Sequence, residues 1–149
     1  MARDVGQSGL VGVAGRELSR LVVQSEQAGL VLEAFARHNV PLARYAEQDG
    51  RAMFLFSLDD VPDWAAIKAK VLSVAQVVAD DAVGAASVVG EGVGAASIAR
   101  AKQVARELGV ATSGLDVSPL RVTLYCALDK TDTLCRALHR TFVEEVPSA

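Results

Sequence analysis

Glycines and carboxylates are the first candidates for binding or catalytic residues in this 149-residue sequence. The segment Gly90-Glu-Gly-Val-Gly-Ala95 fits a G-x-G-x-x-A pattern, in which a glycine turn brings backbone amides and a helix N-terminus to a phosphate. A dinucleotide site of this kind also needs a parallel sheet and an acidic residue near the next strand, where Asp116 stands. The order of the predicted strands favours a different fold, so we interpret these glycines as keeping a loop slim for an effector or a dimer contact.

Other titratable residues are best explained by local structure. Asp59, Asp60 and Asp63 resemble a cluster for a hard cation, but they precede a predicted helix, where carboxylates cap the helix and complement its dipole. His38 and His139 stand near predicted helix ends, without a carboxylate or hydroxyl at a spacing that indicates a catalytic dyad. We therefore assign no catalytic residue and no metal site, and we expect no cofactor.

Two cysteines, Cys126 and Cys135, lie on a predicted strand and helix. They lack the partners of a zinc site, so we interpret them as small buried hydrophobic residues, with a redox pair as the alternative. The N-terminal sequence has neither a signal-peptide core nor a transit-peptide pattern, and no apolar run approaches the roughly 18 residues of a membrane helix. We therefore expect a cytoplasmic protein, in which thiols stay reduced.

The composition is that of a packed globular protein, with 51% hydrophobic and 22% charged residues. The net charge of -3 comes from 15 basic and 18 acidic residues that form no block, which argues against nucleic acid or a membrane surface as a partner. Only 5% of residues are aromatic, so the core must consist mainly of aliphatic side chains. Its few large members are Phe35, Phe54, Phe56, Trp64 and Phe142.

Hydrophobic periodicity in the first half predicts the order strand, helix, strand, strand, helix, strand. Asn39 ends the first helix, and Asp49-Gly50 is typical of a tight hairpin turn. The predicted elements are residues 18–24, 27–38, 42–47, 52–58, 64–72 and 74–79.

The second half repeats this order about 70 residues later, which indicates an internal duplication. Its predicted elements are residues 85–90, 97–108, 110–118, 120–128 and 131–142, and Gly109 closes the first of the two helices. This order is the split βαβ pattern. The sequence thus predicts an α+β protein with two ferredoxin-like (βαββαβ) domains in tandem, with helices on one face of antiparallel sheets.

The second copy ends without room for its last strand, so another segment must complete its sheet. Residues 9–15 are too apolar for a free tail and could supply that strand. We therefore divide the chain into an N-terminal segment, 1–15, that adds a strand to the second domain, a first domain, 16–82, and a second domain, 83–149.

Several segments resemble the regulatory tail of aspartate kinases, which carries two ACT domains in tandem. Residues 86–94 are similar to the strand and glycine loop that open the second ACT domain, and residues 115–123 resemble the segment "ISTSEIKIS". Asp129 and residues 136–142 resemble "D…RALHEAF", and residues 12–14 resemble the "GVA" before the first ACT domain. The resemblance covers nearly the whole chain and is strongest in its C-terminal part.

The resemblance implies an ACT pair that dimerises with another pair. It also implies amino-acid effectors between the loop after the first strand of one domain and the second strand of its neighbour, and a strand from residues 9–13 in the second sheet. The catalytic kinase domain that would precede Gly12 is missing from the sequence, so we expect no phosphoryl transfer.

Carried onto this sequence, the resemblance gives a set of candidate ligand-binding residues. They are Gln24, Ser25, Glu26, Gln27, Pro41, Arg44, Glu47, Gln48, Gly92, Val93, Gly94, Ala95, Ala111 and Ser118. The family's Pro-Gly loop is replaced by residues 24–27 and 94–96, and its Asn at the start of the second strand is replaced by Pro41 and Ala111. These changes remove a side-chain amide and, at Pro41, a backbone donor.

Our leading hypothesis is a stand-alone regulatory ACT-domain protein. It would bind an amino-acid-like molecule at a domain or dimer interface, and so favour one packing of a homodimer or higher oligomer and regulate a partner enzyme of amino-acid metabolism. One alternative is an ACT fold recruited as a small pathway enzyme or accessory protein, with Glu26, Arg44 and Glu47 as polar candidates. Another is a structural subunit that holds an aspartate-kinase-like catalytic chain.

Overall fold

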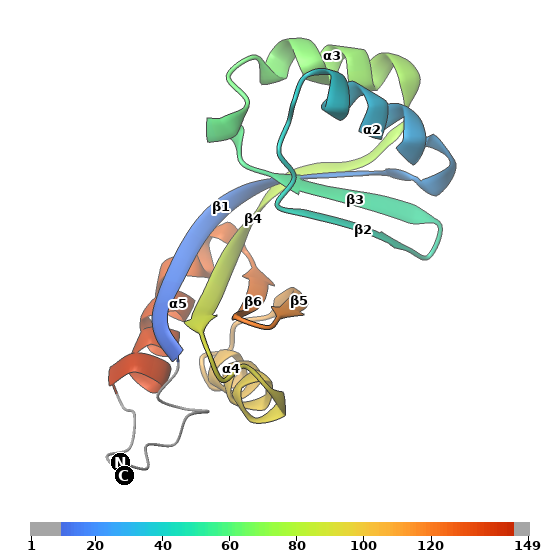
Figure 1. The fold of residues 1–149 in the computed structure, drawn as a ribbon. Helices are drawn as coiled ribbons and strands as arrows, with labels where there is room; N and C mark the ends of the chain where they lie inside the picture. Colours follow the sequence, from blue (N-terminus) through green and yellow to red (C-terminus); the bar gives the residue numbers. More distant parts are fainter. Residues whose placement is uncertain (1–9, 145–149) are drawn as a thin grey trace. The chain divides into compact units, whose positions relative to one another are not determined.

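The computed structural model describes residues 10–144, in which helices and strands alternate in two related units (Figure 1). The strands are β1 (Leu10–Gln24), β2 (Arg44–Gln48), β3 (Arg51–Phe56), β4 (Val77–Gly90), β5 (Thr112–Ser118) and β6 (Arg121–Cys126). The helices are α2 (Ala28–Arg37), α3 (Trp64–Val74), α4 (Ala95–Glu107) and α5 (Thr131–His139). Short 3₁₀ turns precede α2, α3 and α5, and a π-helical turn, Arg140–Glu144, follows α5.

The strands of the described residues form one six-stranded sheet in the order β2-β3-β1-β4-β6-β5, and the chain passes from one compact unit to the other within β1 and within β4. The first unit is Leu18–Ala82, and the second combines residues 10–17 with residues 83–144. Each unit therefore has four strand segments in the ferredoxin-like order, and each long strand serves both units. This confirms the predicted α+β class with two ferredoxin-like units, whose strands belong to one sheet.

The first unit packs α2 and α3 on one face of its sheet. Leu21 of β1 lies opposite Phe54 of β3, and Val23 lies opposite Ala52. The helices contribute Val31, Phe35, Ile67 and Val71, each at most 2% exposed. The two residues of each helix are four positions apart, which places them on one apolar face and explains why both helices bind the same side of the sheet.

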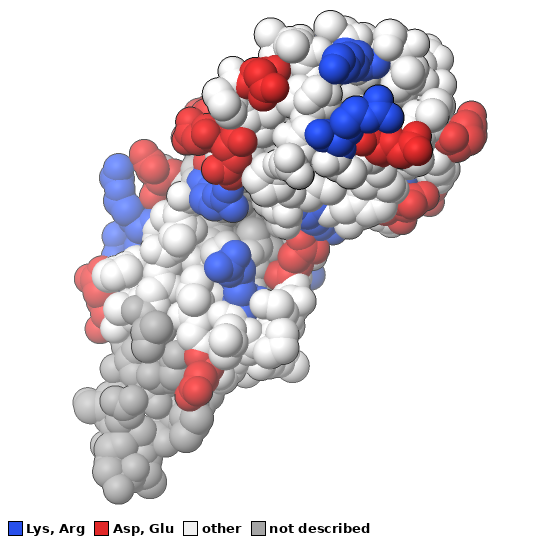
Figure 2. Space-filling model, turned by 45° about the horizontal axis from the view of Figure 1, so that its top comes forward, with Lys and Arg blue, Asp and Glu red and all other residues white. Residues whose placement is uncertain are grey.

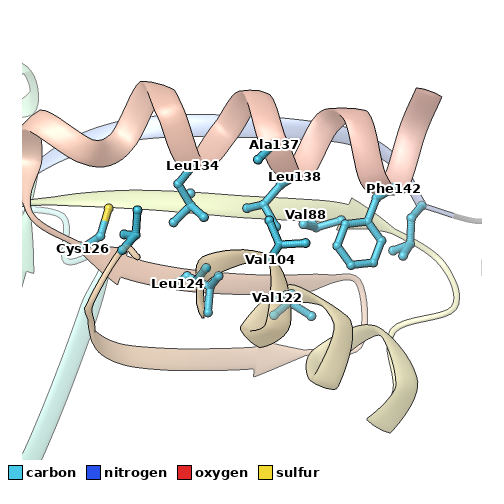
Figure 3. Close-up of a cluster of buried hydrophobic side chains, with 14 residues drawn as sticks. Val88, Val104, Val122, Leu124, Cys126, Leu134, Ala137, Leu138 and Phe142 are labelled. Atoms are coloured by element: carbon cyan, nitrogen blue, oxygen red, sulfur yellow. The ribbon is translucent and has the colours of Figure 1, made fainter. Parts of the chain in front are cut away.

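The second unit builds the same layers from smaller side chains (Figure 3). Alternate residues of β4 and β6 face helices α4 and α5, and Val88 of β4 lies opposite Val122 of β6. Helix α5 lies close to the sheet: a Cβ added at Gly84 would overlap Thr131, and one at Gly15 would lie 2.9 Å from the Cys135 sulfur. The core residues are Leu10, Ala86, Val88, Ala101, Val104, Ala105, Val110, Val122, Leu124, Cys126, Leu134, Ala137, Leu138 and Phe142.

Several local predictions are confirmed. Asp49 and Gly50 have φ of 55° and 75° and form the tight turn between β2 and β3. Asn39 (φ 54°) follows α2, and Gly109 (φ 70°) follows α4, each in the left-handed conformation that ends a helix.

The predicted break between strands at 74–79 and 85–90 is wrong. Val74 still belongs to α3, and a single strand, β4, runs from Val77 to Gly90. Two consecutive aspartates lie inside this strand, and both carboxylates have cationic partners. Asp80 lies 2.6 Å from Lys68, and Asp81 accepts two hydrogen bonds from the Arg20 guanidinium at 2.8 and 2.7 Å.

The N-terminal strand is longer than the predicted 18–24 because β1 begins at Leu10. Residues 10–17 belong to the second unit, and Leu10 and Val13 contact its core. The rest of the predicted N-terminal segment, residues 1–9, lies outside the described residues. The predicted helix 131–142 is also divided, with α5 ending at His139 before the π-helical turn.

Candidate functional site

In the first unit, the loop after β1 lies against the β2–β3 turn. The backbone N–H of Ser25 donates a 2.9 Å hydrogen bond to the carbonyl of Gly50. Arg51 lies opposite Gln24 of β1 and opposite Gln48 of β2, so both glutamines belong to one row across the sheet end. The candidates Gln24, Ser25 and Gln48 are therefore brought together.

Gln27 has a structural partner. Its side-chain oxygen accepts a 2.8 Å hydrogen bond from the backbone N–H of Gln76, which joins the start of α2 to the residue before β4. A ligand could take this oxygen only by displacing a bond that holds the first unit together. Glu26, the acidic residue beside it, is exposed and follows Ser25 in the 3₁₀ turn.

Pro41 and Arg44 lie at the other end of the unit. Arg44 opens β2 and lies opposite Leu55, which in turn lies opposite Arg20. Four residue steps along a strand cover about 13 Å, so Arg44 is remote from Gln48 and from the loop after β1. One unit alone therefore does not bring Pro41 and Arg44 to residues 24–27.

Glu47 faces the helix side of the sheet with Tyr45. The Tyr45 hydroxyl donates a 2.7 Å hydrogen bond to the Glu47 carboxylate, and the Tyr45 ring contacts Phe54 at 5.0 Å between centroids. Burial of the phenol, then this hydrogen bond and the negative charge of Glu47, raise the pKa of Tyr45 to about 12. Arg44, three residues earlier, belongs to the opposite face, as strand alternation predicts.

The second unit repeats the arrangement around its glycine loop. The backbone N–H of Gly90 donates a 2.9 Å hydrogen bond to the carbonyl of Leu120, so the end of β4 lies at the β5–β6 turn. Ser118 lies opposite Arg121, which also lies opposite Val89 of β4. The candidates Gly92, Val93, Gly94 and Ala95 therefore follow a strand end beside Ser118, whereas Ala111 precedes β5 at its far end.

The glycine loop does not fit a dinucleotide. Strand β6 lies between β4 and β5 and is antiparallel to both, so the parallel βαβ unit required by the G-x-G-x-x-A fingerprint is missing. The Gly94 amide, which would face a phosphate, donates instead to the Ser97 hydroxyl at 2.9 Å. Gly90 and Gly92 have φ of 143° and 87°, so the turn itself requires glycine.

The remaining candidates have local roles. His38 follows α2 and accepts a hydrogen bond from Lys70, and His139 pairs with Glu144 at 2.6 Å. Asp63 occupies the N-cap position of α3 but makes no side-chain capping bond. Within residues 10–144, no three His, Cys, Asp or Glu side chains group as a metal site would need.

Both cysteines are free thiols; Cys126 is buried and Cys135 is partly buried. Burial raises the pKa of each thiol, and nearby Asp129 and Asp132 add to the effect at Cys126 and Cys135, respectively. Such thiols are poor nucleophiles at neutral pH, which supports their interpretation as packing residues. No helix in the described part of the chain is long and apolar enough to cross a membrane.

The sequence analysis missed a set of polar side chains on the face of the second unit's sheet opposite α4 and α5. The hydroxyls of Ser87 and Thr123 lie 2.7 Å apart and are buried, and the Tyr125 hydroxyl donates to Asp116 at 2.8 Å. Asp116, Thr123 and Ser87 form one row across β5, β6 and β4. Alternation along these strands was the available signal, because each polar residue is flanked by apolar ones.

No protein-family model matches the chain, and no curated protein matches it. Solved structures, in contrast, match the chain in fold. The regulatory subunit of aspartate kinase from Thermus thermophilus, in its ligand-free form, superposes with a TM-score of 0.73 at 16% identity, over 89% of this chain and 99% of that one. A structure of aspartokinase alpha and beta subunits matches with a TM-score of 0.72 at 18% identity, over 89% and 98% of the chains.

The aspartate kinase of Clostridium acetobutylicum matches over a smaller share of its length. Its TM-score is 0.75 at 10% identity, and the match covers 95% of this chain but 36% of that one. The resemblance found in the sequence is therefore confirmed at the level of structure. This chain has the α+β fold of the aspartate kinase regulatory subunits, with two ferredoxin-like units that share their long strands.

Proposed function

We propose that this chain is a regulatory ACT-domain protein that binds an amino-acid-like small molecule and thereby regulates a partner enzyme of amino-acid metabolism. The observation that carries this proposal is the match to regulatory subunits of aspartate kinase over 98–99% of their length. The partner we favour is a catalytic chain of the aspartate kinase type, because one matched structure is described as holding alpha and beta subunits.

The loop after the first strand of each unit is the proposed place of the ligand. Residues 24–27 with Gln48, and residues 92–95 with Ser118, each lie where a strand end meets a hairpin turn. The first site offers the polar groups of Ser25, Glu26 and Gln48, whereas the second is lined by small residues. We therefore propose that the first site recognises the charged groups of the ligand.

A second copy of the chain is the proposed source of the remaining contacts. Pro41, Arg44 and Ala111 lie at the ends of their units opposite these loops. A ligand that touches both a loop and the start of β2 or β5 needs two units, and we propose that the second unit belongs to another copy, so that binding would favour one packing of a homodimer. The division into domains 16–82 and 83–149, with residues 1–15 completing the second sheet, is part of this proposal and is supported by the compact units.

Thermal unfolding against a panel of free amino acids, nucleotides and dinucleotides tests ligand binding, because a ligand selective for the folded state raises Tm. We expect one amino acid to raise Tm and nucleotides to leave it unchanged. The variants Glu26→Ala and Arg44→Ala should reduce the shift, and Lys102→Ala, on the exposed surface of α4, should keep it. If no amino acid changes Tm, the ligand-binding part of the proposal fails.

Regulation needs a separate measurement. A catalytic chain of the aspartate kinase type is assayed for phosphorylation of aspartate with and without this protein, at several concentrations of the amino acid found above. We expect activity to depend on the amino acid only when this protein is present. An activity that ignores the protein would overturn the proposed partner while leaving ligand binding intact.

A further inference from the structure

A groove lies between α2 and α3 on the side of the helices away from the first unit's sheet. Its volume is about 310 Å³. Figure 2 shows the surface over these helices as largely uncharged, with both basic and acidic side chains on it. The lining consists of Leu30, Glu33, Ala34 and Arg37 of α2, His38, and Lys70, Ser73 and Val74 of α3.

Basic groups meet at the His38 end of the groove. The Lys70 ammonium lies 3.2 Å from Nε2 of His38. An ammonium can only donate, so this ring nitrogen accepts, and two further N–H groups of Lys70 remain for other acceptors. Within residues 10–144, neither Arg37 nor Lys70 has a carboxylate oxygen at ion-pair distance.

Apolar side chains line the rest of the groove. Leu30 is 49% exposed and Val74 is 40% exposed, and both are large enough to gain from being covered. Ala34 lies between Leu30 and His38 in the sequence, and its small side chain leaves space at the bottom of the groove for part of a ligand. Concave apolar surface with a few converging polar groups is typical of small-molecule sites.

The fold itself does not require basic residues at this end of the groove. Basic residues in a last helical turn complement the helix dipole, which is the local explanation of Arg37. In the second unit, however, the positions about 70 residues later hold Glu107 and Leu108, and Glu107 pairs with Arg100 at 3.6 Å. The position equivalent to Lys70 keeps a basic residue, Arg140, so it is the basic end of α2 at Arg37 that distinguishes the first unit.

We propose that this groove binds a small organic anion with a compact, branched apolar body. Its carboxylate would accept hydrogen bonds from Lys70 and Arg37, and its apolar part would cover Leu30, Ala34 and Val74. This site is distinct from the loop sites proposed above and does not depend on them.

The test titrates the full chain, labelled with ¹⁵N, with 4-methylpentanoate and follows the backbone amides by NMR. The neutral alcohol of the same carbon skeleton, 4-methylpentan-1-ol, separates the contribution of the anion from that of the apolar body. Lys70→Gln and Arg37→Gln remove one donor group each, and Lys102→Gln on α4 is the matched control.

We expect saturable shifts confined to residues 30–38 and 70–74. Each groove variant should weaken binding about two- to fivefold, because charge-assisted hydrogen bonds at an exposed site are worth roughly that factor. The control should bind as the parent does, and the alcohol should bind more weakly than the acid. Shifts elsewhere, equal binding of acid and alcohol, or equal binding by the parent and Lys70→Gln would each overturn the proposal.

Discussion

The two units use the same strand order with cores of different size. In the first unit, the Phe35 ring contacts Phe54, Phe56 and Trp64 at centroid distances of 5.2, 5.4 and 5.9 Å. About 70 residues later, the corresponding positions of the second unit hold Ala105, Leu124, Cys126 and Leu134. The same buried positions of the fold can therefore be occupied by aromatic or by aliphatic side chains.

The difference teaches how a sheet and two helices adjust to the volume between them. The small core of the second unit is matched by close approach, because Gly15 and Gly84 leave the space that Cys135 and Thr131 occupy. Protein interiors are packed without large voids, so a smaller set of side chains requires layers that lie closer together. We expect the first unit to be sensitive to lost volume and the second to added volume.

The largest effect should come from removing a central aromatic ring. Phe54→Ala should reduce the free energy of unfolding by about 4–5 kcal/mol, and Leu124→Ala at the matching position by about 3 kcal/mol. Both side chains are at most 1% exposed, so burial does not distinguish them. Urea unfolding followed by circular dichroism, with Trp64 fluorescence as a probe of the first unit, gives the comparison. Equal losses of unfolding free energy in the two variants would show that the aromatic contacts add nothing to the stability of the first unit.

The next effect concerns the close approach of α5. Gly84→Ala should cost about 1–3 kcal/mol, because the new Cβ would overlap the Thr131 side chain. Gly12→Ala, also in a long strand, should be nearly neutral, because nothing lies within 4 Å of the new Cβ. Thermal and urea unfolding of both variants measure the difference. A Gly84→Ala protein as stable as the parent would contradict close packing.

A smaller effect concerns the buried hydroxyl pair of the second unit. Ser87→Ala should cost about 1–2 kcal/mol, because it leaves the Thr123 hydroxyl without its 2.7 Å partner. The equivalent pair in the first unit, Val22 and Met53, is apolar. The double variant Ser87→Ala/Thr123→Val should therefore be more stable than the sum of the two single changes predicts. Additive losses in urea unfolding would argue against coupling.

The smallest effect is a titration in the first unit. Tyr45 has a pKa of about 12 against an ordinary 10.0, so the folded protein holds this proton more tightly than the unfolded chain. Its contribution to stability is complete below about pH 10 and is lost as the pH rises through about 12. Glu47→Gln should move the Tyr45 midpoint down, in NMR of tyrosine labelled with ¹³C. The second unit has Leu115 at this position and offers no counterpart.

The sequence predicted the parts of the fold that depend on local backbone preference and periodicity. Asp49-Gly50, Asn39 and Gly109 each required a left-handed residue, and each marks the end of an element as predicted. The continuous β4 was not predictable in this way, because the ion pairs of Asp80 with Lys68 and of Asp81 with Arg20 join residues that are distant in the sequence.

For the candidate site, the split βαβ order was enough to place each loop near a strand end. It could not show that the Gln27 side chain is occupied by the Gln76 amide, because 49 residues separate the two. Nor could it show the groove between α2 and α3, which depends on which residues of two helices face each other.

The sharing of β1 and β4 between units has a consequence for the order of synthesis. Residues 18–82 form the whole first unit, so its segments leave the ribosome as one continuous stretch. Residues 10–17 emerge earlier, but their neighbour in the second sheet, the later part of β4, is made after that stretch. The first unit can therefore fold while residues 10–17 still lack their neighbouring strand. During that interval the unpaired edge of this segment is exposed, and a chaperone could bind it.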